Sequence, residues 1–305
     1  MGEVPSEQRN SDVPPVEEMF ARIQVNGMIA DEVRGLLVQS ARLVARDFSS
    51  LAKEDWPDLG GSTYSGDRDV TLDERYGTIA ELVRDETRLD LHTVADTLRG
   101  YAALVETQST FVGAVAVGRA VYESSIWASS AMDPAVDPDV RAQRALTRRL
   151  ARLHATQRHR TLLDPTVEPD PAAPDEITHI LALAEDRGWK IIKGQYAPSI
   201  GTKLSIERLA PTLPGALGVE DYAWGSSSSM IHGEQPSLAQ NWITVAFEHV
   251  PAWLTGVWTS GVPFGTRIGL ATTSGYLGVD VGYPAWEMLH KTWDMACSQP
   301  GGWRT

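Results

Sequence analysis

Apolar residues recur at three- and four-residue spacing through most of the chain, a periodicity typical of amphipathic helices. The first such pattern begins at Val16, and Asn26-Gly27 divides it into two segments, of which Asp31 is expected to cap the second. A loop containing several glycines is expected over residues 56–70. No run of alternating apolar and polar residues indicates a sheet, so the chain is predicted to be all-α.

A capping box predicts where the next helix begins. Glu74 follows Thr71 by three residues, a spacing at which each side chain can bond the backbone N–H of the other residue. A helix is therefore expected to open at Thr71. Either Asp90 or Thr93 is expected to cap the helix after it.

The longest apolar stretch, residues 108–131, is predicted to form a central helix that ends before Pro134. An arginine-rich helix is expected over residues 139–160, and a proline-rich linker over residues 164–175. Asp175 is expected to start the following helix, with Gly188 as its C-terminal cap.

The rest of the chain is predicted to be helical in four segments, namely 203–209, 221–233, 237–260 and 267–297. Gly261–Gly265 is expected to interrupt the pattern, and Pro284 to break the last segment. Together these patterns predict a single domain over residues 15–305, a multi-helix bundle of about ten helices. Residues 1–14 are predicted to be a disordered polar tail.

Composition limits the function. The chain has 305 residues, 42% of them hydrophobic, and a formal net charge of −13, so it can bury a sizeable core. The acidic balance argues against non-specific nucleic-acid binding, which depends on neutralising phosphates. The single cysteine, Cys297, allows no internal disulfide, and neither cysteine nor histidine spacing indicates a metal site. A cytoplasmic protein without metal or cofactor is expected.

Arg119 and Glu123 interrupt the most membrane-like stretch, residues 111–127, so no membrane span is expected. They stand four residues apart and share a helix face with Trp127, one turn further on. Together they could bind the carboxylate or phosphate of a ligand, with Glu123 as a general base of raised pKa. The alternative is a buried ion pair that fixes the register of the helix.

Tyr222, Ser229 and His232 are candidate ligand-binding or catalytic residues on a later predicted helix. His232 stands just before a glycine, and a helix C-terminus favours an imidazolium. One hypothesis makes His232 an acid–base or anion-contacting group that reaches the Arg119–Glu123 face. The other makes it a helix-end residue that bonds backbone carbonyls.

Arg148 and Arg149 are the candidates in the arginine-rich helix. No Asp or Glu occurs between residues 140 and 161, so this stretch is locally basic within an acidic chain. One interpretation is an anion clamp for a phosphate or carboxylate. The other is a helix face exposed to solvent.

Three segments carry a resemblance: the run from Arg119 to Pro134 with the arginine helix after it, the helix end Glu185–Trp189, and residues 222–233. As a set they resemble a group of largely uncharacterised actinobacterial all-helical proteins and, more distantly, the HEPN-like helical superfamily. The resemblance covers about residues 100–240. It implies a helical bundle and no settled activity.

HEPN ribonucleases carry an arginine and a histidine separated by four to six residues, a pair that contacts the scissile phosphate. Arg149 and His154 match this spacing, as do Arg152 and His159. Leu150 follows Arg149, where those nucleases usually have a polar residue.

Three functions therefore compete. The favoured one is a binding or interaction protein, in one version homodimeric, with a polar pocket for a small anionic or partly hydrophobic metabolite. The second is an enzyme on a small metabolite that uses Arg119, Glu123 and His232 as anion clamp and acid–base groups. The third is a HEPN-like ribonuclease that uses Arg149 and His154.

Overall fold

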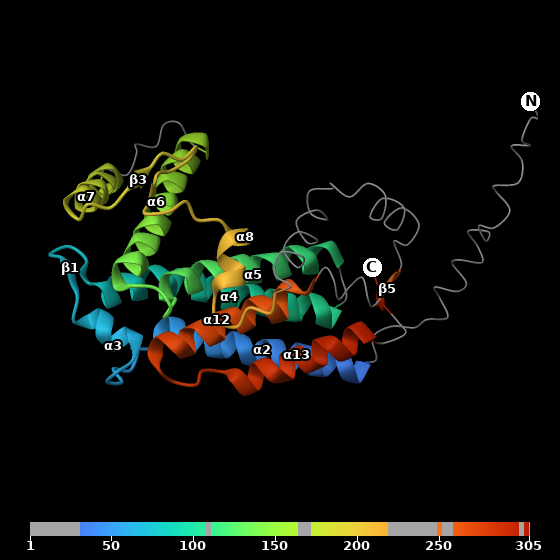
Figure 1. Cartoon of the computed structure of the whole chain (residues 1–305). Coiled ribbons are helices and arrows are strands. Elements are labelled where there is room, and N and C mark those ends of the chain that lie inside the picture. The colour runs from blue at the N-terminus through green and yellow to red at the C-terminus, as the bar shows by residue number, and fades with distance from the viewer. Residues whose placement is uncertain are drawn as a thin grey trace, which may run out of the picture.

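Five long helices form a bundle, in which they lie side by side (Figure 1). The structure, a computed structural model, describes residues 31–107, 111–163, 172–218, 249–251, 259–298 and 302–304. The central helix α4 packs against α2 and α5, α12 packs against α5, and α13 packs against α2. The all-α bundle predicted from the sequence is confirmed. The helices are α2 (Asp31–Lys53), α4 (Ile79–Thr107), α5 (Phe111–Met132), α12 (Gly261–Leu277) and α13 (Tyr283–Ser298).

The arginine-rich helix α6 (Pro138–Leu163) packs on α4 and rises away from the bundle (Figure 1). It carries α7 (Ala172–Asp186) on its side, as well as a short hairpin of β3 (Ile191–Ile192) and β4 (Ser199–Ile200). Because α6 leaves the bundle, its position depends on its contacts with α4, α5, α7 and β4.

The remaining described elements are short, and their strands form only two-stranded antiparallel pairs. One pair, β1 with β2, is a hairpin that lies between α3 and α4 in sequence. These elements are α3 (Thr63–Arg68), β1 (Thr71–Asp73), β2 (Gly77–Thr78), α8 (Ile206–Leu209), the 3₁₀ turn η1 (Ala210–Thr212), β5 (His249–Pro251) and β6 (Gly302–Arg304).

The core lies where the faces of these helices meet. Leu37, Val44 and Phe48 of α2 and Leu91 and Leu98 of α4 are each at most 1% exposed and belong to one continuous cluster. Burying a side chain of this size contributes roughly 1.5–3 kcal/mol. The three- and four-residue spacing that predicts the helices is thus the spacing of their buried faces.

The capping box predicted at Thr71 and Glu74 is wrong. Thr71 begins strand β1, and the box forms seven residues later: Glu81 N donates to Thr78 Oγ1 over 3.2 Å, and Thr78 N donates to Glu81 Oε2 over 2.7 Å. In between, Asp73 Oδ1 accepts the backbone N–H of Arg75 and Tyr76. This local turn competes with helix at Glu74 and explains the shift.

Asp90 and Thr93 cap no helix, because α4 runs through them as one helix of 29 residues. Thr93 Oγ1 donates to the carbonyl of Leu89 one turn back, which satisfies the hydroxyl inside the helix. Asp90 is buried and bonds Arg148 of α6. Both side chains therefore have hydrogen-bond partners within a continuous helix, and neither acts as a cap.

The interruption predicted at Gly261–Gly265 is also wrong, since α12 begins at Gly261 and passes through all five residues. Gly261, Gly265 and Gly269 recur every four residues on one face. A Cβ at Gly265 would lie 2.6 Å from Tyr122 Cα, and one at Gly261 would lie 2.8 Å from the carbonyl oxygen of Gly118. These glycines let α12 approach α5 closely.

The other boundaries agree in part. The central helix ends at Met132, α7 ends before Gly188, which has a φ of 67°, and α12 and α13 are separated just before Pro284. The predicted start of α7 at Asp175 is wrong by three residues, because α7 begins at Ala172 inside the predicted linker. The described residues begin at Asp31, so its predicted cap is not tested. The helix predicted over 203–209 shrinks to the single turn α8. The helix predicted over 237–260 is wrong at 249–251, where β5 pairs with β6. The tail 1–14, residues 164–171 of the linker and the segment 221–233 lie outside the described residues.

None of the helices in the described parts of the chain combines the length and the apolar character that crossing a membrane requires.

We predict that replacing Glu81 with Ala lowers the free energy of unfolding by about 1 kcal/mol at pH 7, because the helix loses its capping box. Hydrogen bonds from Thr78 hold the pKa of Glu81 below its usual range. The contribution of Glu81 is therefore complete above its unfolded pKa, about 4.3, and is lost as the pH falls through the lower folded value. Urea unfolding at pH 7 and pH 3 measures this.

The control variant is Glu74→Ala, because Glu74 is the residue of the box that does not form and is exposed. It should change the free energy of unfolding by less than about 0.5 kcal/mol at either pH. If both variants lost the same free energy of unfolding at pH 7, the capping box of Thr78 and Glu81 would not stabilise the helix.

Candidate functional site

The Arg119–Glu123 pair forms as predicted, within α5. Arg119 Nε donates to Glu123 Oε1 over 2.6 Å, and the two side chains are 18% and 32% exposed. Trp127, one turn further along, lies under the guanidinium of Arg148, 4.9 Å from ring centroid to Cζ. The structure thus brings Trp127 and the arginine helix together. Tyr222, Ser229 and His232 lie outside the described residues.

Arg148 forms a two-point ion pair with Asp90 of α4. Its Nη2 and Nε donate to the two carboxylate oxygens over 2.7 and 3.2 Å. The Asp90 side chain is only 6% exposed, and burial raises its pKa more strongly than Arg148 lowers it. Burying a carboxylate is expensive unless it is paired, so Asp90 holds α6 to α4 through Arg148.

Arg149 is held between two carboxylates. Its Nη1 donates to Glu86 Oε1 over 2.7 Å, and its Nε donates to Glu176 Oε1 of α7. Its guanidinium also lies over the ring of Tyr76, at 5.4 Å. Arg152, one turn later, pairs with the same Glu86, whose side chain is 3% exposed. The arginines of this face are therefore paired and only partly exposed, because acids from α4 and α7 neutralise them.

Glu86 and Asp90 are not among the predicted site residues, although the sequence contains a signal for their pairing with arginines. They stand one turn apart at positions where the inward apolar stripe of α4, with Val83 and Leu91, would otherwise continue. Two carboxylates in an inward stripe require cationic partners. The arginine run with no acids of its own is the complementary signal.

A second buried ion pair anchors the start of α6. Arg141 Nε and Nη2 donate to the two oxygens of Asp67, over 2.8 and 2.6 Å, and Asp67 is fully buried. Tyr276 of α12 donates to Asp67 Oδ2 over 2.9 Å. This group joins α3, α6 and α12 inside the core. Arg141, Asp67 and Tyr276 line neither of the two pockets described next, and their contacts stabilise the fold.

A polar pocket of about 250 Å³ lies where the β1–β2 hairpin, α4, α6 and α7 meet. Charged side chains predominate among the residues that line it. They are Arg75 and Tyr76 of the hairpin, Leu82 and Asp85 of α4, Arg149 of α6 and Glu176 of α7. Of these, only Arg149 is a predicted site residue.

Hydrogen bonds fix the hairpin wall of this pocket. Tyr76 donates its hydroxyl to Glu176 Oε1 over 3.3 Å. His179 Nε2 and Asp73 Oδ2 lie 2.7 Å apart, which ties the hairpin to α7. Burial, together with the charge of Glu176, raises the pKa of Tyr76. The phenol therefore stays protonated and serves as a hydrogen-bond donor.

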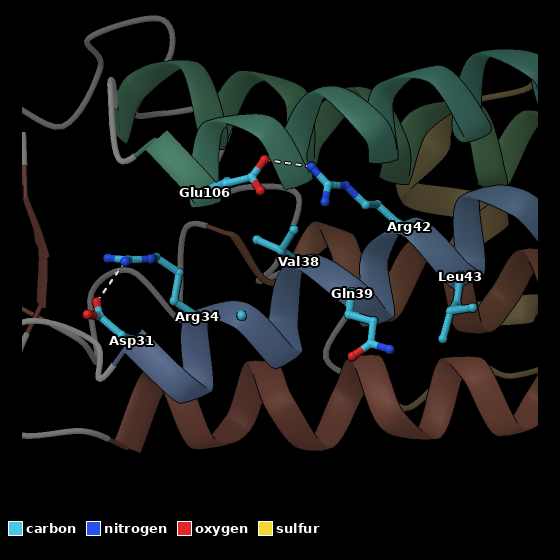
Figure 2. A pocket seen from close by; sticks show the side chains of 8 residues that line it. Asp31, Arg34, Val38, Gln39, Arg42, Leu43 and Glu106 are labelled. Atoms are coloured by element: carbon cyan, nitrogen blue, oxygen red, sulfur yellow. Dashed lines mark hydrogen bonds and ion pairs between the residues drawn. The ribbon is translucent and has the colours of Figure 1, made fainter.

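A larger hollow of about 440 Å³ lies over α2 and the end of α4 (Figure 2). Its ion pairs, Arg34 with Asp31 and Arg42 with Glu106, span 2.7 and 2.6 Å. In each pair at least one partner is more than half exposed. Exposed pairs of this kind contribute about 0–1 kcal/mol, so this surface lacks the buried support of the hairpin pocket.

The ribonuclease pair does not meet at the hairpin pocket. Arg149 lines the pocket, but His154 is not among its lining residues. In the described parts of the chain, His154 Nε2 is shielded from solvent and has no hydrogen-bond partner. The Arg149 guanidinium already contacts two carboxylates.

Among the described residues, no group of three or more His, Cys, Asp or Glu side chains could hold a metal ion. Comparison of the chain with protein-family models, with curated proteins and with solved structures finds no match. The HEPN-like resemblance therefore stays a prediction.

We predict that Glu86→Gln lowers the free energy of unfolding by about 2–4 kcal/mol, because Arg149 and Arg152 lose a buried counter-charge. The expected loss is smaller than for a fully buried ion pair, because the side chains of Arg149 and Arg152 are 31% and 25% exposed. Urea unfolding measures it. Asp85→Asn is the matched control: it changes the neighbouring residue, which is 60% exposed, and should alter stability by less than about 0.5 kcal/mol. Similar values for both variants would contradict a stabilising role for Glu86.

Proposed function

We propose that this protein binds a small charged metabolite in the hairpin pocket, as a helical-bundle binding protein. The observation that carries this proposal is that the pocket has a fixed cation, Arg149, whose position is set by the buried Glu86. Sites whose polar groups are already in place lose less conformational entropy on binding. The pocket is thus largely pre-formed, as small-ligand sites usually are.

The ionisation of the lining groups fits a binding role. Tyr76 remains a donor, since its pKa is raised, and an arginine side chain stays protonated in proteins. Both groups therefore keep one protonation state around neutral pH. Such groups orient and hold a ligand, whereas a general acid or base works best with a pKa near the operating pH.

The Arg119–Glu123 pair supports a second candidate, an enzyme with its site on α5. The pair is neither sealed in the core nor fully solvated, at 18% and 32% exposure, and its 2.6 Å bond aligns the carboxylate. In this proposal Arg119 binds an anionic group, and Glu123 with His232 transfers protons. The ribonuclease, the homodimer and the actinobacterial origin stay untested predictions.

The cytoplasm is the proposed location. The single cysteine, Cys297, is partly buried, and burial raises its pKa to about 12, which keeps it a thiol of low reactivity. A chain that depends on no disulfide suits a reducing compartment.

The test is a thermal-shift screen of the wild type against amino acids, small carboxylates, small amines and nucleotides. A ligand at ten times its Kd should add about 1.4 kcal/mol of stability, which raises the Tm by a few degrees. The double variant Arg75→Ala/Asp85→Ala removes the two exposed charged walls, whose side chains are 38% and 60% exposed, and should keep the fold. We expect it to lose the shift.

Arg42→Gln, in the hollow over α2, is the control and should retain the full shift, because its side chain is 53% exposed and lies outside the hairpin pocket. If no compound stabilises the wild type, or if a ligand stabilises the double variant equally, the pocket is not the binding site.

A further inference from the structure

The hairpin pocket has charges of both signs in equal number. Arg75 and Arg149 are its cations, and Asp85 and Glu176 are its anions. A ligand with a single negative charge would meet two carboxylates, and one with a single positive charge would meet two guanidinium groups. The lining therefore favours a ligand that carries both charges.

The two inner charges restrain each other. Glu176 Oε1 accepts from both Arg149 and Tyr76, and Arg149 also donates to Glu86. A ligand that displaced Arg149 would leave the buried Glu86 with fewer partners. These inner groups thus form a fixed back wall.

The two outer charges can exchange partners at little cost. Arg75 pairs with Asp175 over 3.1 Å, and that aspartate is 75% exposed. Asp85, itself 60% exposed, has its nearest cation, Arg84 Nε, 3.9 Å away. Exposed pairs of this kind are weak, so a ligand can replace them. Because Arg75 lies on the hairpin and Asp85 on α4, the exchangeable cation and anion come from different elements.

Size and lining narrow the ligand further. A volume of about 250 Å³ is smaller than the roughly 300–1,000 Å³ of sites for drug-sized molecules, so the pocket favours a ligand smaller than a nucleotide. Leu82 is only 2% exposed, and the ring of Tyr76 is covered by the guanidinium of Arg149 and by the ring of His179. The lining is therefore almost entirely polar, which suits a ligand with both charges and a small side chain.

We infer that the ligand is a small zwitterion of the α-amino-acid class, an inference that rests on the proposed binding function. Its carboxylate pairs with Arg75 and its ammonium with Asp85. Its side chain is small, and Arg149 with Glu176 forms the fixed back of the site.

The test is isothermal titration of the full chain with matched sets of compounds. Each set holds one small amino acid, the carboxylic acid that lacks its amine, and the amine that lacks its carboxylate; alanine, propionate and ethylamine form one set. We expect the best amino acid to bind at least ten times more tightly than either analogue.

Two single variants separate the charges. Arg75→Gln should weaken binding of the amino acid at least tenfold and should not weaken binding of the amine, which loses a repulsive cation. Asp85→Asn should weaken binding of the amino acid by a similar factor and should not weaken binding of the carboxylate, which loses a repulsive anion. Arg42→Gln, in the hollow over α2, should change none of these affinities. Both pocket residues are more than a third exposed, so circular dichroism should show an intact fold.

The outcomes separate this inference from the proposed function. If a carboxylate or an amine binds as tightly as the amino acid and the pocket variants weaken it, the binding function stands and the zwitterion is wrong. If an amino acid binds but neither variant weakens it, the assignment of its charges to Arg75 and Asp85 is wrong. If no compound of any class binds the wild type, the proposed function fails, and the zwitterion with it.

Discussion

Two carboxylates buried on α4, Glu86 and Asp90, constrain the rest of the structure. A carboxylate removed from water destabilises a protein by several kcal/mol unless cations and hydrogen bonds replace its hydration. Arg148, Arg149 and Arg152 of α6 supply these partners. A guanidinium pairs with a carboxylate in a fixed planar geometry. These ion pairs therefore both attach α6 to α4 and determine its position along α4. A helix that leaves the bundle thus gains a defined position (Figure 1).

The same ion pairs connect the fold to the candidate site. Arg149 faces the buried Glu86 on one side and contacts Glu176 and the ring of Tyr76 on the other. The position of α6 therefore sets the back wall of the hairpin pocket. The contact between His179 and Asp73 holds strand β1 of the hairpin to α7. In the proposed function, the structural and the ligand-binding roles therefore meet in Arg149.

The sequence predicted the fold class and most long helices, because their buried faces follow a regular spacing. It failed where the competing signals were local or depended on another helix. Thr71 with Glu74 and Thr78 with Glu81 have the same capping-box spacing. Only the second pair forms the box, because the side chain of Asp73 stabilises a turn at the first. The glycines of α12 resemble a helix break in the sequence, but in the fold they permit the close approach of α5.

The candidate site was less predictable than the fold. Arg119–Glu123 was found because both residues lie on one helix. The partners of Arg149 could not be found by spacing, because Glu86 lies 63 residues before it and Glu176 lies 27 residues after it. Charge pairing across that distance is set by tertiary packing, and a single sequence contains no direct record of it.

A double-mutant cycle between Glu86 and Arg149 tests most directly whether buried ion pairs position α6. The free energies of unfolding of the wild type, Glu86→Gln, Arg149→Met and the double variant give the coupling energy between the two side chains. We expect a coupling energy above about 1.5 kcal/mol for Glu86 and Arg149, and less than about 0.5 kcal/mol for the exposed pair Arg42–Glu106. Equal coupling energies in the two cycles would contradict this expectation.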